Sequence, residues 1–73
     1  MLYYKTSQPI PGSGDAWMYY ECTDEKRILR YVTHIPATNK TERVTDPVVK
    51  KLYRPELLIP SSQDEFERYW AMP

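Results

Sequence analysis

Ala16-Trp-Met-Tyr-Tyr-Glu-Cys22 is followed by Thr23-Asp-Glu-Lys26 and then by Arg27-Ile-Leu-Arg-Tyr-Val-Thr-His34. The two outer segments are rich in aromatic and β-branched residues and the middle one is polar, which is typical of a β-hairpin. Both faces of this hairpin hold large side chains, whereas a solvated sheet face is mostly polar. We therefore expect each face to need a cover or a partner.

One face of the hairpin follows from the alternation of side chains along a strand. A turn of two or four residues places Met18 opposite Tyr31 and Tyr20 opposite Leu29. A turn of odd length would shift this pairing by one residue. We predict that this face is the core and that the C-terminal helix covers it; its members are Ala16, Met18, Tyr20, Cys22, Leu29 and Tyr31.

The other face carries the residue types that dominate protein interfaces, Trp, Tyr and Arg. The same pairing places Trp17 opposite Val32, Tyr19 opposite Arg30 and Glu21 opposite Ile28, with His34 at the end of the face. We predict a non-enzymatic protein-interaction module, with a partner protein or a second copy of the chain bound on this face. The predicted binding residues are Trp17, Tyr19, Arg30 and Val32.

The rest of the chain predicts further elements around the hairpin. Residues 2–6 have strand character, residues 7–15 contain two prolines and two glycines and indicate a loop, and residues 40–45 favour a short polar edge strand. Asp46-Pro47 favours the start of a short helix over residues 47–53, with an extended segment as the alternative. Residues 56–60 are an extended apolar connector.

The C-terminal segment has the clearest local signal. Ser62 and Glu65 have the spacing of a capping box, and Phe66, Tyr69 and Trp70 form one apolar stripe of a helix. The predicted fold class is therefore α+β: a three- or four-stranded antiparallel sheet with a C-terminal helix packed on one face, in a single domain over residues 1–73.

Length and composition limit the class of protein. A chain of 73 residues buries a small core, and such chains are usually stabilised by disulfides, a metal or oligomerisation. Cys22 is the single cysteine, which excludes an internal disulfide, and with one histidine it favours no metal site or cofactor. No signal peptide or membrane span is indicated, so we expect a soluble, cytoplasmic protein.

Catalysis has no support in the sequence. Cys22 and His34 are the one Cys–His combination, and the predicted pairing places them on opposite faces of the hairpin. Cys22 is expected to be a small buried core residue and His34 an ordinary residue at a strand end.

Binding of single-stranded nucleic acid is the alternative function. Trp17, Tyr19 and Arg30 can stack on bases, and phosphate contacts can then come from Lys50, Lys51 and Arg54. The net charge of zero weakens this alternative, since there is no overall field that attracts nucleic acid or membranes.

Two segments resemble a family of small bacterial α+β domains that has no agreed activity. The first is Met18-Tyr-Tyr-Glu21 with Asp24-Glu25 and Arg27-Ile-Leu-Arg-Tyr31, which resembles the opening hairpin of that family. The second is Ile59-Pro-Ser-Ser-Gln-Asp-Glu-Phe-Glu-Arg-Tyr-Trp70, which resembles its closing Glu-Phe-Glu-x-x-Trp helix. The resemblance covers about half of the chain. It implies a bacterial origin and a compact α+β fold, and it carries over no site residues.

Overall fold

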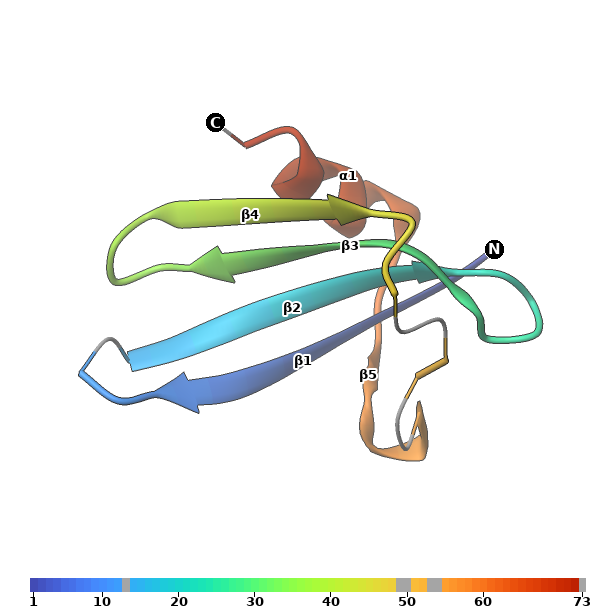
Figure 1. Cartoon of the computed structure of the whole chain (residues 1–73), viewed down its shortest axis with the longest axis horizontal. Coiled ribbons are helices and arrows are strands. Elements are labelled where there is room, and N and C mark those ends of the chain that lie inside the picture. The colour runs from blue at the N-terminus through green and yellow to red at the C-terminus, as the bar shows by residue number, and fades with distance from the viewer. Residues whose placement is uncertain (13, 49–50, 53–54, 73) are drawn as a thin grey trace.

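Four long strands and one short strand form an antiparallel sheet in a computed structural model of the chain, which describes residues 1–12, 14–48, 51–52 and 55–72. The order of the strands across the sheet is β4-β3-β2-β1-β5 (Figure 1). The elements are β1 (Leu2–Ile10), β2 (Gly14–Cys22), β3 (Ile28–Ile35), β4 (Lys40–Thr45), the 3₁₀ turn η1 (Pro55–Leu57), β5 (Ile59–Pro60) and α1 (Gln63–Trp70).

The predicted fold class is confirmed in its main features. The domain is α+β, its sheet is antiparallel, and the polar edge strand β4 has the expected bounds. The sheet has five strands where three or four were expected, because the apolar connector before the helix contributes β5. This strand pairs with β1 through Tyr4↔Pro60 and Lys5↔Ile59.

The first hairpin is longer than the sequence indicates. β1 continues through Pro9 to Ile10, and β2 already begins at Gly14, so most of the predicted loop over residues 7–15 is strand. Pro9 is tolerated because β5 pairs with β1 only at Tyr4 and Lys5, which leaves the outer edge of β1 without a neighbouring strand at Pro9. Gly12 and Gly14 have φ of 79° and 78°, which suits glycine in the tight turn between the strands.

The central hairpin has a different register from the predicted one. Its turn closes with hydrogen bonds from the Lys26 N–H to the Thr23 carbonyl and from the Thr23 N–H to the Arg27 carbonyl, and Lys26 has a φ of 65°. Cys22 therefore pairs with Ile28, and a bulge at Leu29 then shifts the ladder by one residue. The pairs beyond the bulge are Glu21↔Arg30, Tyr20↔Tyr31, Tyr19↔Val32, Met18↔Thr33 and Trp17↔His34.

The shift in register keeps most of the predicted face groups intact. Trp17, Tyr19 and Glu21 still share a face with Arg30, Val32 and His34, because their new partners belong to the same group. Ile28 changes sides, since it now pairs with Cys22.

The C-terminal helix begins where its capping signal predicts. Ser62 is the N-cap of α1, and its hydroxyl accepts a hydrogen bond from the Glu65 N–H at 3.1 Å. The Glu65 carboxylate accepts hydrogen bonds from the Ser61 hydroxyl and from Lys5, which ties the first turn of the helix to β5 and β1.

The predicted short helix over residues 47–53 is not observed at its described positions. Asp46 has a φ of 48°, which is not the extended conformation of a helix N-cap. Lys51 forms an antiparallel bridge with Arg27, so the extended alternative describes this position. Val49, Lys50 and Tyr53 lie outside the described residues.

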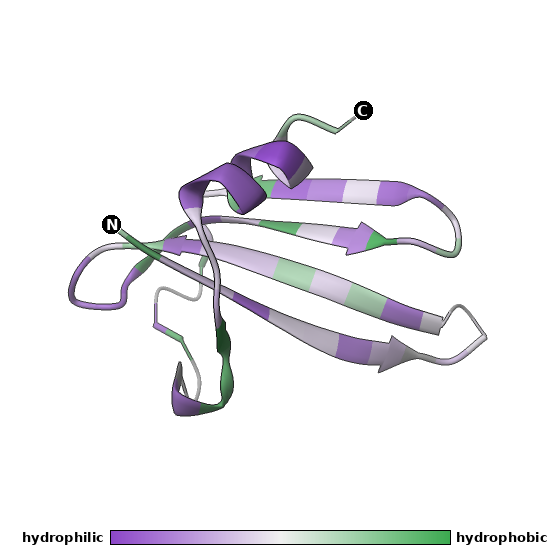
Figure 2. Cartoon of the chain, turned by 180° about the vertical axis from the view of Figure 1, so that it is seen from behind, coloured by the Kyte–Doolittle hydropathy of each residue, from purple (hydrophilic) through white to green (hydrophobic). Residues whose placement is uncertain are grey.

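The helix packs on the face that we expected to be open. Phe66 is fully buried against Tyr19 and Val32, and Trp17, Tyr69 and Trp70 pack around this cluster. Figure 2 shows α1 lying across this side of the sheet, whereas the chain after β4 crosses the opposite side, which faces the viewer in Figure 1. The prediction that the helix covers the other face is thus wrong. On that face Ala16 and Cys22 are buried, whereas Leu29 is 41% exposed. Its remaining members are half-buried: Met18, Tyr20 and Tyr31.

The physical reason for this choice of face is electrostatic as well as apolar. The covered face carries two cations, Lys5 and Arg30, and the helix supplies a carboxylate to each. Lys5 pairs with Glu65 at 3.0 Å and Arg30 with Glu67 at 2.5 Å. A helix on the other face would form neither ion pair. Hydrophobicity alone does not distinguish the two faces, because both carry large apolar side chains.

Candidate functional site

The predicted binding residues lie beneath the helix. Tyr19 and Val32 are buried, and Trp17 is half-buried beside Tyr19, with 6.4 Å between the ring centroids. Tyr19 in turn stacks on Tyr69 of α1 at 4.2 Å. Burial raises the pKa of the Tyr19 phenol. These aromatic side chains contribute to the core of the folded chain.

Arg30 is the centre of a polar network on the same face. Its guanidinium donates to both carboxylate oxygens of Glu21, at 2.6 and 3.1 Å, and the Tyr3 hydroxyl donates to the same carboxylate at 2.9 Å. These hydrogen bonds lower the pKa of the buried Glu21 carboxyl. The guanidinium also stacks on the rings of Phe66 and Trp70, at 4.8 and 4.5 Å. The network fixes the helix to the sheet.

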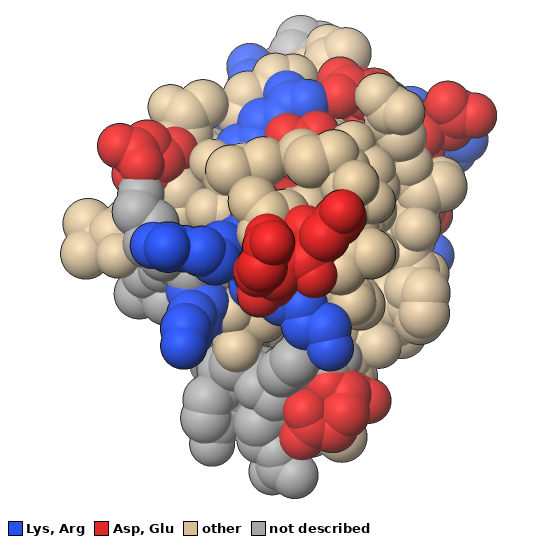
Figure 3. All heavy atoms as spheres, turned by 90° about the vertical axis from the view of Figure 1, so that its right-hand side faces the viewer, with Lys and Arg blue, Asp and Glu red and all other residues tan. Residues whose placement is uncertain are grey.

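The predicted phosphate contacts are only partly described. Lys50 and Arg54 lie outside the described residues, and Lys51 lies at the opposite side of the sheet from the helix. Figure 3 shows basic and acidic side chains interspersed over the end of the molecule that carries the turn between β2 and β3. On this side the described cations form no continuous basic stripe of the kind that follows a phosphate backbone.

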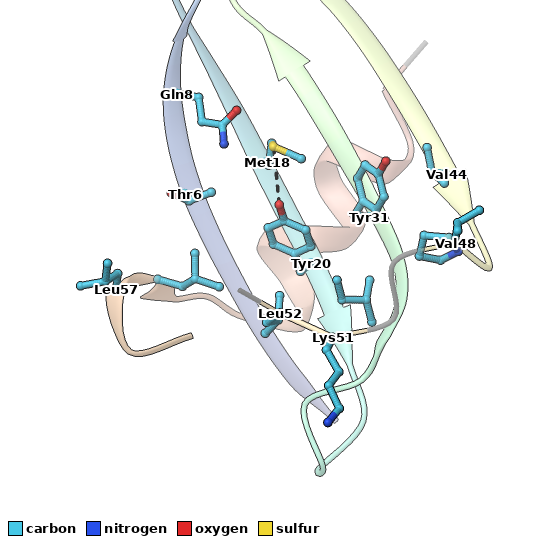
Figure 4. Close-up of a pocket in the computed structure, with 13 residues that line it drawn as sticks. Thr6, Gln8, Met18, Tyr20, Tyr31, Val44, Val48, Lys51, Leu52 and Leu57 are labelled. Carbon is cyan, nitrogen blue, oxygen red and sulfur yellow. Dashed lines mark hydrogen bonds between the residues drawn. The ribbon is translucent and has the colours of Figure 1, made fainter. Parts of the chain in front are cut away.

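A hollow lies on the sheet face opposite α1. We call this face the open face and define it by Met18, Tyr20, Ile28, Tyr31 and Val44. The hollow has a volume of about 710 Å³, within the range of ligand and anchor pockets. Its lining comes from the four long strands and from the chain between β4 and β5: Thr6, Gln8, Met18, Tyr20, Ile28, Tyr31, Val44, Pro47, Val48, Lys51, Leu52, Leu57 and Leu58 (Figure 4).

Two tyrosines form the floor of the hollow. The rings of Tyr20 and Tyr31, which are cross-strand partners, lie 5.7 Å apart and tilted by 43°. The Tyr20 hydroxyl donates to the thioether sulfur of Met18 at 3.5 Å, a weak acceptor. Burial raises the pKa of Tyr20, and Tyr31 adds to the effect. This hydroxyl can therefore exchange its sulfur partner for a better acceptor on a bound molecule.

Aliphatic side chains project from the rim of the hollow. Val48 is 97% exposed and Leu57 is 63% exposed. Figure 4 places them on opposite sides of the two tyrosines. Exposed aliphatic side chains around an apolar hollow are unusual for a surface that meets only water. They make the open face a candidate contact surface.

The described lining residues carry no carboxylate, imidazole or thiol. Lys51 is their one charged member, and its side chain extends away from the tyrosines (Figure 4). The described lining is thus mainly apolar, and its polar groups are the hydroxyls of Thr6, Tyr20 and Tyr31, the Gln8 amide and the Lys51 ammonium.

Cys22 and His34 are far apart along the central hairpin. His34 pairs with Trp17 near one end of β2, and Cys22 is the last residue of that strand. Cys22 is fully buried with a free thiol, as predicted, and burial raises its pKa to about 11. His34 is also buried; its Nδ1 lies 3.2 Å from the Thr41 hydroxyl, and its ring contacts Tyr69.

The residues that the structure describes contain neither a metal-binding cluster nor a membrane-spanning helix. No group of three or more metal-ligating side chains is found among them. No helix in the described part of the chain is long and apolar enough to cross a membrane.

Comparison with known proteins adds no relative. No protein-family model, curated protein or solved structure matches this chain.

The hollow on the open face does not follow from the hairpin sequence, because several of its lining residues lie far from the hairpin along the chain. Leu52, Leu57 and Leu58 belong to the segment before the helix, and Val44 comes from the edge strand. The available signal was the apolar segment Leu57-Leu-Ile59, which has no polar alternation and therefore needs an apolar neighbour.

Proposed function

We propose that this chain is a small protein-interaction module that binds its partner through the open face. The observation that carries the proposal is the apolar hollow on a sheet face that the helix leaves uncovered. Interface energy concentrates in pockets that receive one or two apolar anchors and exclude water around them. The two tyrosines on the floor and the aliphatic rim supply such a pocket.

The proposed surface is the opposite sheet face from the one expected from sequence. A sheet with two apolar faces and one helix leaves one face for a partner. The faces are exchanged, because the helix covers Tyr19 and Val32 and leaves Tyr20 and Tyr31 accessible. A bacterial origin and a cytoplasmic location stay predictions.

No observation on the described residues favours nucleic-acid binding. Its stacking platform required Trp17 and Tyr19 on a free surface, and both belong to the helix-covered side. Arg30 is likewise engaged with Glu21 and Glu67.

Site-specific photo-crosslinking in the native cells tests the proposal. A photoreactive phenylalanine at Val48 stands at the rim of the hollow, and the same residue at Ile59, which is 47% exposed and outside the hollow, is the matched control. We expect a discrete protein adduct from the Val48 position that disappears when Tyr31→Glu is added. Equal adduct yields from both positions, or none at Val48, would contradict the proposal.

A further inference from the structure

We propose that Met18 is a site of reversible oxidation, at which the Tyr20 hydroxyl binds the oxygen of the methionine sulfoxide. The inference is independent of what binds in the hollow, because it concerns side chains of this chain alone. Three features of the molecule support it: the access to the Met18 sulfur, its hydrogen bond from Tyr20, and the hydroxyl groups on either side of it.

The Met18 sulfur lies where a small oxidant can reach it. Met18 is half-buried and lines the hollow, whose volume is about 710 Å³. Hydrogen peroxide is little larger than water, so it fits in this space without any opening of the fold. Cys22, the single thiol, is fully buried and so lacks this access. The oxidation chemistry open to the folded chain at the hollow is therefore that of a thioether.

The Tyr20 hydroxyl already points at this sulfur. It donates to the Met18 thioether at 3.5 Å, the contact drawn as a dashed line in Figure 4. A thioether is a weak acceptor, whereas a sulfoxide oxygen is a strong one. An S–O bond of about 1.5 Å and an O–H···O hydrogen bond of about 2.7 Å, meeting at about 110°, span about 3.5 Å. The present separation of the two heavy atoms therefore also suits the oxidised side chain.

The Tyr20 phenol remains a donor over a wide range of pH. Burial raises its pKa, and the neighbouring Tyr31 raises it further. The hydroxyl therefore keeps its proton and can donate it in a hydrogen bond to the new oxygen.

The cross-strand neighbours of Met18 are also hydroxyl residues. Thr6 on β1 and Thr33 on β3 are its partners in the two ladders. Residues directly opposite one another share a face of the sheet, so both threonines lie on the same side as Met18. Methionine sulfoxide disrupts a packed apolar core because its oxygen has no partner there. At Met18 the oxygen instead meets a donor and polar neighbours, so the folded chain tolerates the oxidation.

The oxidation is a transfer of one oxygen atom from a peroxide. The sulfur lone pair attacks one peroxide oxygen, the O–O bond breaks, and the transferred oxygen passes its proton to the departing hydroxide, which leaves as water. The sulfur is oxidised by two electrons and the peroxide is reduced by two. Sulfoxide reductases reverse this change, so the floor of the hollow has a reduced, apolar state and an oxidised, polar one.

Peroxide treatment of the full chain tests the access to Met18. Mass spectrometry of peptides measures sulfoxide at each methionine as a function of time. We expect Met18 to be oxidised in the folded chain within about tenfold of the rate of Met1, which is 59% exposed. A Met18 that is oxidised only after denaturant is added would overturn the proposal, and this measurement uses the unaltered sequence.

Removing the phenol hydroxyl tests the role of Tyr20. Oxidation should lower the urea midpoint of Tyr20→Phe at least about twofold more than that of the native chain, because the sulfoxide loses its donor. Tyr31→Phe, which removes the other phenol hydroxyl of the floor, should behave as the native chain does. Met18→Leu measures what oxidation of the remaining methionines contributes, and circular dichroism shows that each variant is folded. Equal decreases in Tyr20→Phe and in the native chain would overturn the role of Tyr20.

Discussion

The guanidinium of Arg30 lies 4.5 Å from the centre of the Trp70 ring, and this contact joins the middle of the sheet to the last turn of the helix. The same guanidinium pairs with Glu21 beside it on the sheet and with Glu67 on the helix. One side chain therefore joins Glu21 of the sheet to Glu67 and Trp70 of the helix, and together with the Lys5–Glu65 pair it favours the face of the sheet that the helix covers.

Replacing Arg30 with lysine should lower the free energy of unfolding by about 2 kcal/mol. Lysine keeps the charge but loses the two-pronged hydrogen bond to Glu21 and the planar stacking on Phe66 and Trp70. Arg43→Lys is the matched control, since Arg43 is exposed on the edge strand and donates to the Met72 carbonyl. Chemical denaturation measures both variants, and equal losses in the two would contradict the central role of Arg30.

The stability of the domain should decrease in acid because of Glu21. The pKa of this carboxyl is lowered in the folded state, chiefly by its hydrogen bonds from Arg30, so the unfolded chain binds the proton more readily. The stabilisation is complete above the unfolded pKa near 4.5 and is lost as the pH falls through the lowered folded pKa. Glu65, whose pKa is lowered by Ser61 and Lys5, acts in the same direction.

Glu21→Gln should therefore flatten the dependence of the unfolding free energy on pH below the unfolded pKa of the Glu21 carboxyl, which is near 4.5. Denaturation at a series of pH values measures the slope. An unchanged slope in the variant would show that the Glu21–Arg30 pair does not contribute to the acid sensitivity.

The Cys22 thiol should be almost unreactive in the folded protein. It is fully buried, and burial raises its pKa to about 11, so it is protonated at about pH 8 and shielded from reagents. A thiol-reactive chromogenic disulfide should label the chain slowly in buffer and rapidly in denaturant. Rapid labelling of the native protein would mean that Cys22 is not in the core.

Two valines on adjacent strands distinguish the covered face from the open one. Val32 is buried beneath the helix, and Val44 lines the hollow. Val32→Ala should cost about 2 kcal/mol of unfolding free energy through lost burial and a cavity, and Val44→Ala less than about 1 kcal/mol. Thermal and chemical unfolding at low protein concentration measure both. A larger loss at Val44 would indicate that the helix covers the other face.

The sequence predicts those parts of the fold that depend on local signals. Ser62 and Glu65 mark the start of the helix, the stripe through Phe66, Tyr69 and Trp70 marks its packing side, and alternation along β2 separates Tyr19 from Tyr20 correctly. Each of these follows from residues within one element.

The remaining features depend on contacts between distant residues. Pairs such as Lys5–Glu65 help to decide which face of the sheet the helix covers. These two residues lie 60 positions apart, so no short segment of the sequence contains both. The register is set by a left-handed Lys26 and a bulge at Leu29, and neither residue type favours those conformations. The hollow could not be predicted, because the path of the chain between β4 and β5 brings its leucines over the open face.

Nuclear Overhauser contacts of the Phe66 ring test most directly which face the helix covers. We predict strong contacts from this ring to the methyl groups of Val32 and to the ring of Tyr19, and none to the methyl group of Met18. Contacts from Phe66 to Met18 or Tyr31, with none to Val32, would place the helix on the other face and contradict both the open face and the function proposed for it.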